Sequence, residues 1–146
     1  MVLTARSLRV DAEVDALAEV RRFVRSAAAQ AGAPDDCLAD IVQAVDEAAT
    51  NAIVHGYAGA PGWLEVAASL DDGRFVVRLE DAAPEFDPTT VPEPDLSVPP
   101  MARRPGGMGI HLMRACTDEL SHRPRPGGGN ILTLAQATGP NWKKEG

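Results

Sequence analysis

The stretch that decides the fold is DEAATNAIVHGY, which runs from Asp46 to Tyr57. Apolar residues recur in it, and in the residues before it, at the three- and four-residue spacing of one helix face. Asp35 suits the start of this helix because an acidic side chain favours the positive end of the helix dipole. The pattern therefore predicts a helix that begins near Asp35 and stops at His55-Gly56.

The helix carries a polar pair, Glu47 and Asn51, one turn apart. At ~100° per residue the two side chains lie ~40° apart and nearly opposite the apolar centre of the helix. A solvated helix face would show the same pattern. A carboxylate can also act as a base, and an amide oxygen can ligate a hard cation such as Mg²⁺. The helix alone leaves both interpretations open.

The rest of the chain alternates helix and strand signals. Leu3 to Val10 is compatible with a first strand, and helical spacing from Val14 to Ala27 predicts a first helix. Asp71-Asp72-Gly73 separates two apolar runs, which is a strong hairpin signal. A second hairpin is predicted with its turn at Gly127-Gly128-Gly129. Before it, GGMGIHLMRACTDEL predicts a third helix whose plausible core residues are Ile110, Leu112, Met113, Cys116 and Leu120.

The length and composition fit one domain and limit its partners. The chain has 146 residues, of which 45% are hydrophobic, so it can bury one core. A formal net charge of −7 argues against binding to nucleic acid or to an anionic membrane surface. No apolar run is long enough to cross a membrane and no secretory signal begins the chain, so we expect a cytoplasmic protein. Cys37 and Cys116 form no CxxC and are expected to be buried thiols.

Three further segments carry candidate functional residues. Residues 84–105 hold seven of the twelve prolines and predict an irregular loop of about twenty residues, which is typical of a functional lid or of disorder. Gly106-Gly107-Met108-Gly109 would let the backbone before a helix approach an anion, although a tight turn explains the glycines as well. Asp81 ends a strand, where an acid is commonly only a turn residue.

Taken in order, these motifs resemble the nucleotide-binding boxes of the GHKL ATPase superfamily. The resemblance is closest to the small anti-sigma-factor serine kinases of the RsbW type, and it covers the chain from about residue 10 to residue 137. The motifs that carry it are Glu47-x-x-x-Asn51-x-x-x-His55-Gly56, then Asp81 with Phe86-Asp87-Pro88, then Gly107-x-Gly109-Ile110 with Asp118-Glu119.

The resemblance implies a fold and a domain plan. We expect an α/β two-layer sandwich of the Bergerat type, in which helices cover one face of a mixed, mainly antiparallel sheet. One ATPase domain would span residues 1–138, with the Pro-rich segment at about 84–107 as a lid over ATP. Residues 139–146 would be a loose C-terminal tail. Homodimers are common in the family, and the sequence neither supports nor excludes one.

The resemblance also implies roles for single residues. Glu47 would be the general base, Asn51 would ligate Mg²⁺, and Asp81 would accept a hydrogen bond from the adenine amino group. Ala83 stands where the family usually has glycine, and its methyl group would narrow the adenine pocket or weaken ATP binding. The other candidates for contact with ATP or ADP are His55, Phe86, Arg103, Arg104, Gly106, Gly107, Met108, Gly109, Ile110 and Thr133. For His55, the arginines and Thr133, a capping, surface or plain strand role fits as well.

The implied activity is transfer of the γ-phosphate of ATP to a serine or threonine of a small anti-anti-sigma protein with a STAS domain. In its other state such a protein would hold a sigma factor inactive. The alternative is a non-catalytic module of the same fold that sequesters a protein and binds nucleotide weakly or not at all, and Ala83 favours it. A histidine kinase catalytic domain working alone is disfavoured, because no helical phosphoacceptor segment precedes the ATP-binding part.

Overall fold

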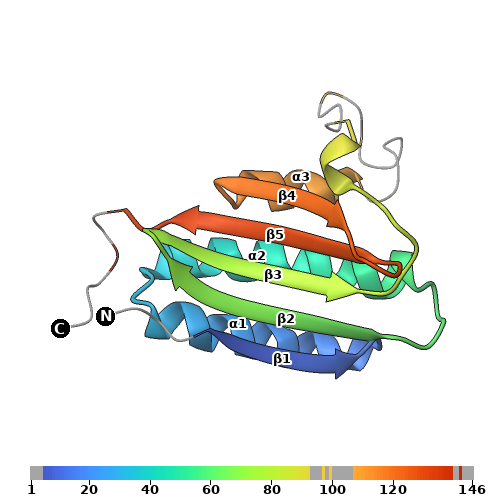
Figure 1. The fold of residues 1–146 in the computed structure, drawn as a ribbon. Helices are drawn as coiled ribbons and strands as arrows, with labels where there is room; N and C mark the ends of the chain where they lie inside the picture. The colour runs from blue at the N-terminus through green and yellow to red at the C-terminus, as the bar shows by residue number, and fades with distance from the viewer. Residues whose placement is uncertain (1–4, 93–96, 98, 100–106, 140–141, 143–146) are drawn as a thin grey trace.

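The computed structural model describes residues 5–92, 97, 99, 107–139 and 142. Five strands form one sheet in the order β1-β2-β3-β5-β4, and every pairing between neighbours is antiparallel (Figure 1). The strands are β1 (Arg6–Asp11), β2 (Trp63–Asp71), β3 (Arg74–Asp81), β4 (Glu119–Pro124) and β5 (Asn130–Ala137). The helices are α1 (Leu17–Gln30), α2 (Asp35–Thr50) and α3 (Gly107–Ala115). Single 3-10 turns form η1 (Val14–Ala16) and η3 (Pro88–Thr90), and the π-helix η2 (Asn51–Gly56) continues α2.

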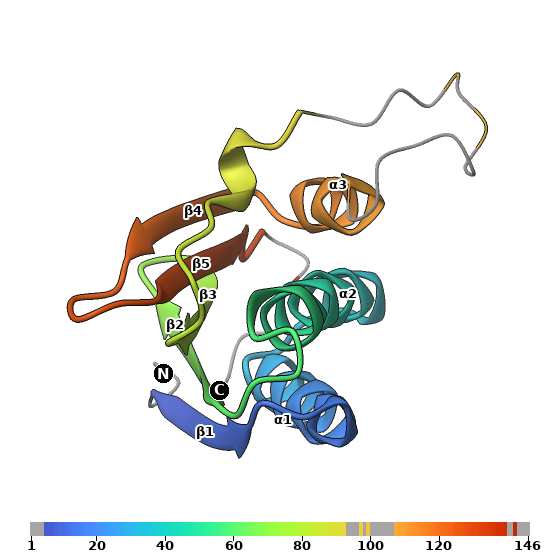
Figure 2. The ribbon, with the colours of Figure 1, turned by 90° about the vertical axis from the view of Figure 1, so that its right-hand side faces the viewer.

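The helices all lie on one face of the sheet, and the core is the layer between them (Figure 2). Alternate residues of each strand point toward the helices, as the two-residue period of a strand requires. Phe75 and Val77 of β3, Leu134 of β5 and Ile41 of α2 are fully buried there. The expected two-layer sandwich is confirmed. The sheet of the described residues is antiparallel throughout, however, whereas we expected a mixed one.

Both predicted hairpins are present. Asp72 and Gly73 connect β2 to β3 with positive φ angles of 48° and 77°, as a two-residue turn between twisted strands requires. Gly127, Gly128 and Gly129, which also have positive φ, connect β4 to β5. The register that follows pairs Asp81 at the end of β3 with Asn130 at the start of β5.

One predicted helix end agrees with the structure and another differs. The helix through Glu47 continues as η2 and ends at Gly56, as predicted, and the chain then turns at Ala58 and Gly59, with φ of 50° and 90°. The third helix ends at Ala115, so Leu120 is not a helical residue. The Asp118 amide donates to the carbonyl of Ala135, which aligns the chain with β5 and starts β4.

The C-terminal tail is not loose at Trp142. This side chain is only 7% exposed, and its ring centroid lies 5.8 Å from that of Phe75 in the core. Burial of the apolar indole against the core favours this position of the Trp142 side chain. The tail prediction was therefore wrong at this position.

Other predictions fall partly outside the described residues. The first strand begins at Arg6 rather than Leu3, and residues 1–4 are not described. Most of the proposed lid is not described either, although its start includes the short turn η3. Cys37 and Cys116 are free thiols, half-buried rather than fully buried, and burial raises the pKa of each. Among the described residues, no helix has both the length and the apolar character needed to cross a membrane.

Candidate functional site

A cavity of about 500 Å³ opens between the helix layer and one end of the sheet. This volume lies within the range of about 300–1,000 Å³ that is common for small-molecule sites. Residues from α2, η2, β3, β4, β5 and α3 contribute to its wall. Six of the predicted site residues line it: Asn51, His55, Asp81, Ala83, Phe86 and Ile110.

Asp81 is the buried acid of the cavity, only 6% exposed at the end of β3. Its Oδ1 accepts hydrogen bonds from the backbone amide of Ala83 at 3.0 Å and from Nδ2 of Asn130 at 2.9 Å. Both of these hydrogen bonds go to Oδ1, and none among the described residues meets the same geometric standard at Oδ2. Burial raises the pKa of the Asp81 carboxyl, and the bonds from Asn130 and Ala83 oppose that shift. Asp81 thus lines the cavity with its two described hydrogen bonds both on Oδ1.

Asn130 holds Asp81 in this orientation, and the sequence reasoning missed it. Its Oδ1 accepts from the Phe86 amide at 2.8 Å and lies 2.7 Å from Nε2 of His122. Its Nδ2 donates to Asp81 and to the carbonyl of Pro84 at 3.1 Å. The strand period could have revealed it, because Asn130 shares the inward face of β5 with Leu132 and Leu134.

Two residues fix the corner behind Asp81. The Tyr57 hydroxyl accepts from the Ala82 amide at 2.8 Å and donates to the carbonyl of Trp63 at 2.6 Å, so it ties the end of η2 to β2 and β3. Gly129 has a φ of 121°, and a Cβ added there would overlap the carbonyl oxygen of Asp81. Only glycine allows β5 to start this close to the acid.

Glu47 near the end of α2 and Asn51 at the start of η2 are both half-buried and lie one turn apart. Asn51 lines the cavity. Glu47 does not line it, and its carboxylate lies beside the first turn of α3: a Cβ added at Gly109 would come within 2.8 Å of Glu47 Oε2. The other oxygen, Oε1, accepts from Gln43 Nε2 at 2.9 Å. The pair therefore lies against α3 and the cavity rather than on a freely solvated face.

The structure does not bring Thr133 to the cavity. In the register of the sheet Thr133 is opposite Arg78 and Ser121, on the face that no helix covers. Gly107 and Met108 start α3. Arg103, Arg104 and Gly106 lie outside the described residues.

The methyl group of Ala83 fits beside a glycine. Ala83 is 3% exposed, and a Cβ built on Gly56 would lie 3.1 Å from the Ala83 Cβ. The methyl group therefore occupies space at the cavity wall, and a residue larger than glycine at position 56 would crowd it. The cavity of about 500 Å³ is present with this methyl group in place.

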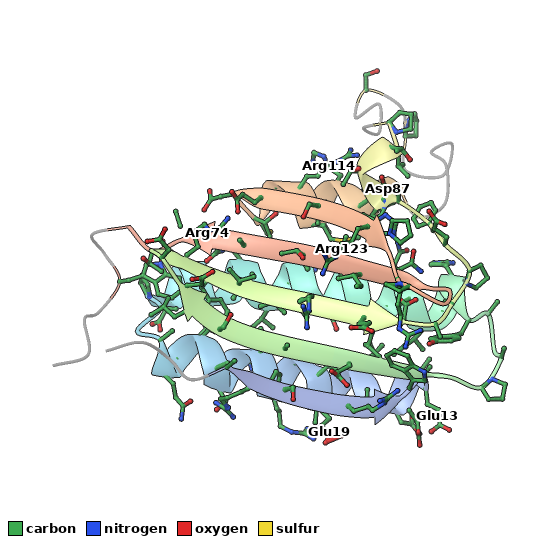
Figure 3. The ribbon with its side chains drawn as sticks, in the orientation of Figure 1. Glu13, Glu19, Arg74, Asp87, Arg114 and Arg123 are labelled. Atoms are coloured by element: carbon green, nitrogen blue, oxygen red, sulfur yellow. The ribbon has the colours of Figure 1, made fainter. Side chains whose placement is uncertain are left out.

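The start of the Pro-rich segment is fastened to α3. Nη2 of Arg114 donates to the carbonyls of Pro88, Thr89 and Val91 at 3.0, 3.0 and 2.7 Å. Asp87 caps η3 by accepting from the Thr89 amide at 2.8 Å, and the bond from the Thr89 hydroxyl lowers the Asp87 pKa. Figure 3 shows Asp87 and Arg114 at the same end of the molecule, beside β4.

The comparison with protein families identifies this arrangement. Residues 10–136 match the model of the histidine kinase-like ATPase domain. The chain belongs to this family. The match spans the helices, the cavity and most of the sheet, so the expected family membership is confirmed.

Curated relatives of this histidine kinase-like ATPase domain include anti-sigma F factors. The chain is 28% identical to the anti-sigma F factor of Caldanaerobacter subterraneus subsp. tengcongensis over 121 residues, which cover 83% of this chain and 85% of that protein. It is 34% identical to the anti-sigma F factor of Halalkalibacterium halodurans over 101 residues, 68% of each chain.

A solved structure agrees with the family. The domain superposes with a TM-score of 0.67 and 26% identity on the crystal structure of the RsbU and RsbW domains of a Mycobacterium tuberculosis protein. The match covers 92% of this chain and 32% of that one, so this chain spans about a third of the larger protein.

Proposed function

We propose that this protein binds Mg-ATP in the cavity and transfers the γ-phosphate to a serine or threonine of an anti-anti-sigma protein with a STAS domain. In the other state of this partner switch it holds a sigma factor inactive. The observation that carries the proposal is Asp81, a buried carboxylate with one oxygen bonded within the fold and the other free. ATP and sigma factors are cytoplasmic, so we place the reaction there.

The free oxygen of Asp81 suits a base that carries an amino group. In the proposal Oδ2 accepts from the adenine amino group, which distinguishes adenine from guanine. The surrounding wall is largely apolar, with Ile110 and Met113 buried on one side and the half-exposed ring of Phe86 at the opening. Such a wall suits the faces of a purine ring.

The polar pair of Glu47 on α2 and Asn51 at the start of η2 supplies the groups that phosphoryl transfer requires. Asn51 offers an amide oxygen at the cavity wall and Glu47 a carboxylate one turn earlier, and oxygen donors fit Mg²⁺. The described residues contain no cluster of three or more His, Cys, Asp or Glu that would hold a metal by itself. The proposal therefore has Asn51 holding Mg²⁺ together with the phosphates, whose charge that ion neutralises when bound. Glu47 accepts the proton of the attacking hydroxyl.

Phosphorylation then changes which complex forms. A phosphate adds about two negative charges to the contact surface of the STAS partner. This protein itself has a formal net charge of −7. Like charges weaken the kinase–product complex and release the protein to bind the sigma factor.

The test is phosphate transfer from Mg-ATP to STAS-domain proteins encoded in the same genome, read as phosphoserine or phosphothreonine by mass spectrometry. Glu47→Gln should lower the rate at least about 100-fold while ADP binding remains, because a general base contributes that much or more. Asp46→Asn is the matched control, since the neighbouring carboxylate pairs with Arg21 at 2.8 Å. An unchanged rate in Glu47→Gln would refute the role of Glu47.

A second function has one observation in its favour. The methyl group of Ala83 lies at the cavity wall where the family usually has glycine. In that reading the domain sequesters a protein partner without catalysis. Absence of ADP binding to the folded protein, restored by Ala83→Gly, would select this function over the kinase.

A further inference from the structure

His122 on β4 is a buried imidazole that no role above uses. Its side chain is only 3% exposed, and its Nε2 lies 2.7 Å from Oδ1 of Asn130. That oxygen also accepts the Phe86 amide, while Nδ2 of Asn130 faces the Asp81 carboxylate and the Pro84 carbonyl. Only one orientation of the Asn130 amide satisfies all these partners. Nε2 of His122 must therefore carry a proton and donate it.

Asn130 connects the acid to the beginning of the lid segment. It binds the carbonyls of Ala83 and Pro84 at 3.4 and 3.1 Å and the amide of Phe86 at 2.8 Å. On the other side of the imidazole, His122 Nδ1 lies 3.9 Å from the Asp87 carboxylate. The same small network thus contacts residues 83–87 and, through Nδ2 of Asn130, Oδ1 of Asp81.

A rotated Asn130 amide would break the network at its most sensitive point. Its oxygen would then face Oδ1 of Asp81, and two acceptors cannot share a hydrogen bond. The carboxylate would have to turn and lose its geometry toward the cavity. The hydrogen bonds from the Phe86 amide and from His122 Nε2 to Asn130 Oδ1 both oppose this rotation. Without the His122 donor, only the bond from the Phe86 amide opposes it from that side.

We propose that His122 is a positioning residue. By donating to Asn130 it fixes the side-chain amide, and thereby sets both the course of residues 83–86 and the direction of the free oxygen of Asp81. This inference deepens the proposed function, on which its consequence for nucleotide choice rests. It predicts that His122 controls discrimination between adenine and a base without the amino group.

The first test needs no ligand. Amide hydrogen exchange is followed by NMR in the unmodified protein and in His122→Phe, which keeps a ring but has no donor. Exchange of the Phe86 amide should become about tenfold faster, as expected for loss of a hydrogen-bond network worth about 1.4 kcal/mol. The amides of Val77 and Leu134 in the core report that the variant is folded. His122→Gln, which retains a donor, should restore protection, and Ser121→Ala on the outer face should change nothing.

The second test measures binding of ADP and inosine diphosphate, which carries a carbonyl in place of the amino group. The ratio of the two affinities should fall about five- to tenfold in His122→Phe and recover in His122→Gln, because a misdirected acceptor forfeits most of one hydrogen bond. A purely structural role would lower both affinities together and leave the ratio unchanged.

The outcomes separate this proposal from the proposed function. Unchanged Phe86 exchange in His122→Phe overturns the positioning role, as does an unchanged ratio in a protein that binds ADP. If the unmodified protein binds neither nucleotide, the proposed function fails; faster Phe86 exchange, rescued by His122→Gln, would then still support the positioning role.

Discussion

The substitution Asp81→Asn changes one group at the cavity and leaves its supports intact. The Ala83 amide and Nδ2 of Asn130 both donate to Oδ1 of Asp81. An asparagine at position 81 keeps these two bonds only if its oxygen takes the place of Oδ1. Its NH₂ group must then take the place of Oδ2, so an acceptor for the adenine amino group becomes a donor.

The expected loss of ADP affinity follows from replacing this acceptor by a donor. Losing a hydrogen bond to a charged acceptor costs about 1.5–3 kcal/mol, which corresponds to about a 10- to 150-fold weaker binding of ADP. Folding should not suffer. The pKa of Asp81 is raised in the folded protein, so folding disfavours its ionised form. The free energy of unfolding therefore falls as pH rises from the ordinary pKa of an aspartate toward the raised pKa of Asp81. At neutral pH we therefore expect Asp81→Asn to be at least as stable as the parent.

The assay is calorimetric titration with ADP and Mg²⁺, paired with thermal unfolding. Asp71→Asn, an exposed carboxylate at the end of β2, is the control and should bind as the parent does. In Asp81→Asn the affinity for inosine diphosphate should rise relative to the affinity for ADP, because the new NH₂ group can donate a hydrogen bond to the carbonyl of the inosine base. Binding of ADP to the parent should also weaken as pH falls through the raised pKa of Asp81. Unchanged ADP affinity in Asp81→Asn refutes the reasoning.

Three further substitutions test the structure around the site. Gly129→Ala should destabilise the fold by more than about 3 kcal/mol, because the new Cβ clashes with Asp81 and the φ angle is unfavourable for alanine. Gly127→Ala has open space around its Cβ position and should cost only about 1–2 kcal/mol. Equal losses of stability for the two variants in urea unfolding would contradict the clash. Trp142→Ala should lower the free energy of unfolding by about 3 kcal/mol, because the indole no longer packs on Phe75. The control Val14→Ala, at an exposed position, should lower it by less than about 0.5 kcal/mol. A Tm of Trp142→Ala equal to that of the parent would show that Trp142 does not pack on the core. Arg114→Met should speed amide hydrogen exchange at Thr90 and Val91, because the guanidinium supports the turn η3 in which these amides are bonded. Arg22→Met, at an exposed position, should leave this exchange unchanged. Unchanged protection of Thr90 and Val91 in Arg114→Met would show that Arg114 does not hold η3 in place.

Much of the site could be read from neighbouring residues in the chain. Glu47 and Asn51 share a helix face because 3.6 residues make a turn, and the apolar residues around them show which face is buried. The Asp72-Gly73 turn requires positive φ at two positions, which Asp and Gly tolerate, so the hairpin that ends in Asp81 was predictable too. The order of these motifs along the chain was enough to indicate the family.

The predictions failed where the partner lies far along the chain. Leu120 fits the helical spacing that precedes it, but the hydrogen bond from the Asp118 amide to Ala135 and the pairing of Glu119 with Ala135 make that segment a strand. Thr133 has a plausible side chain for a polar site, yet a shift of one position on β5 puts Asn130 and Leu132 at the cavity and Thr133 on the opposite face.

By itself, then, the sequence determined the local elements and the motifs they carry, because helix periodicity and turn geometry depend on residues within a few positions of each other. Only the tertiary structure decided the surroundings of Asp81. Its partner Asn130 is 49 residues away, and the Tyr57 hydroxyl is 25 residues from the amide it binds. Such pairs form because a buried polar group must find a hydrogen-bond partner within the fold, and the packing of the whole sheet selects which one is in reach.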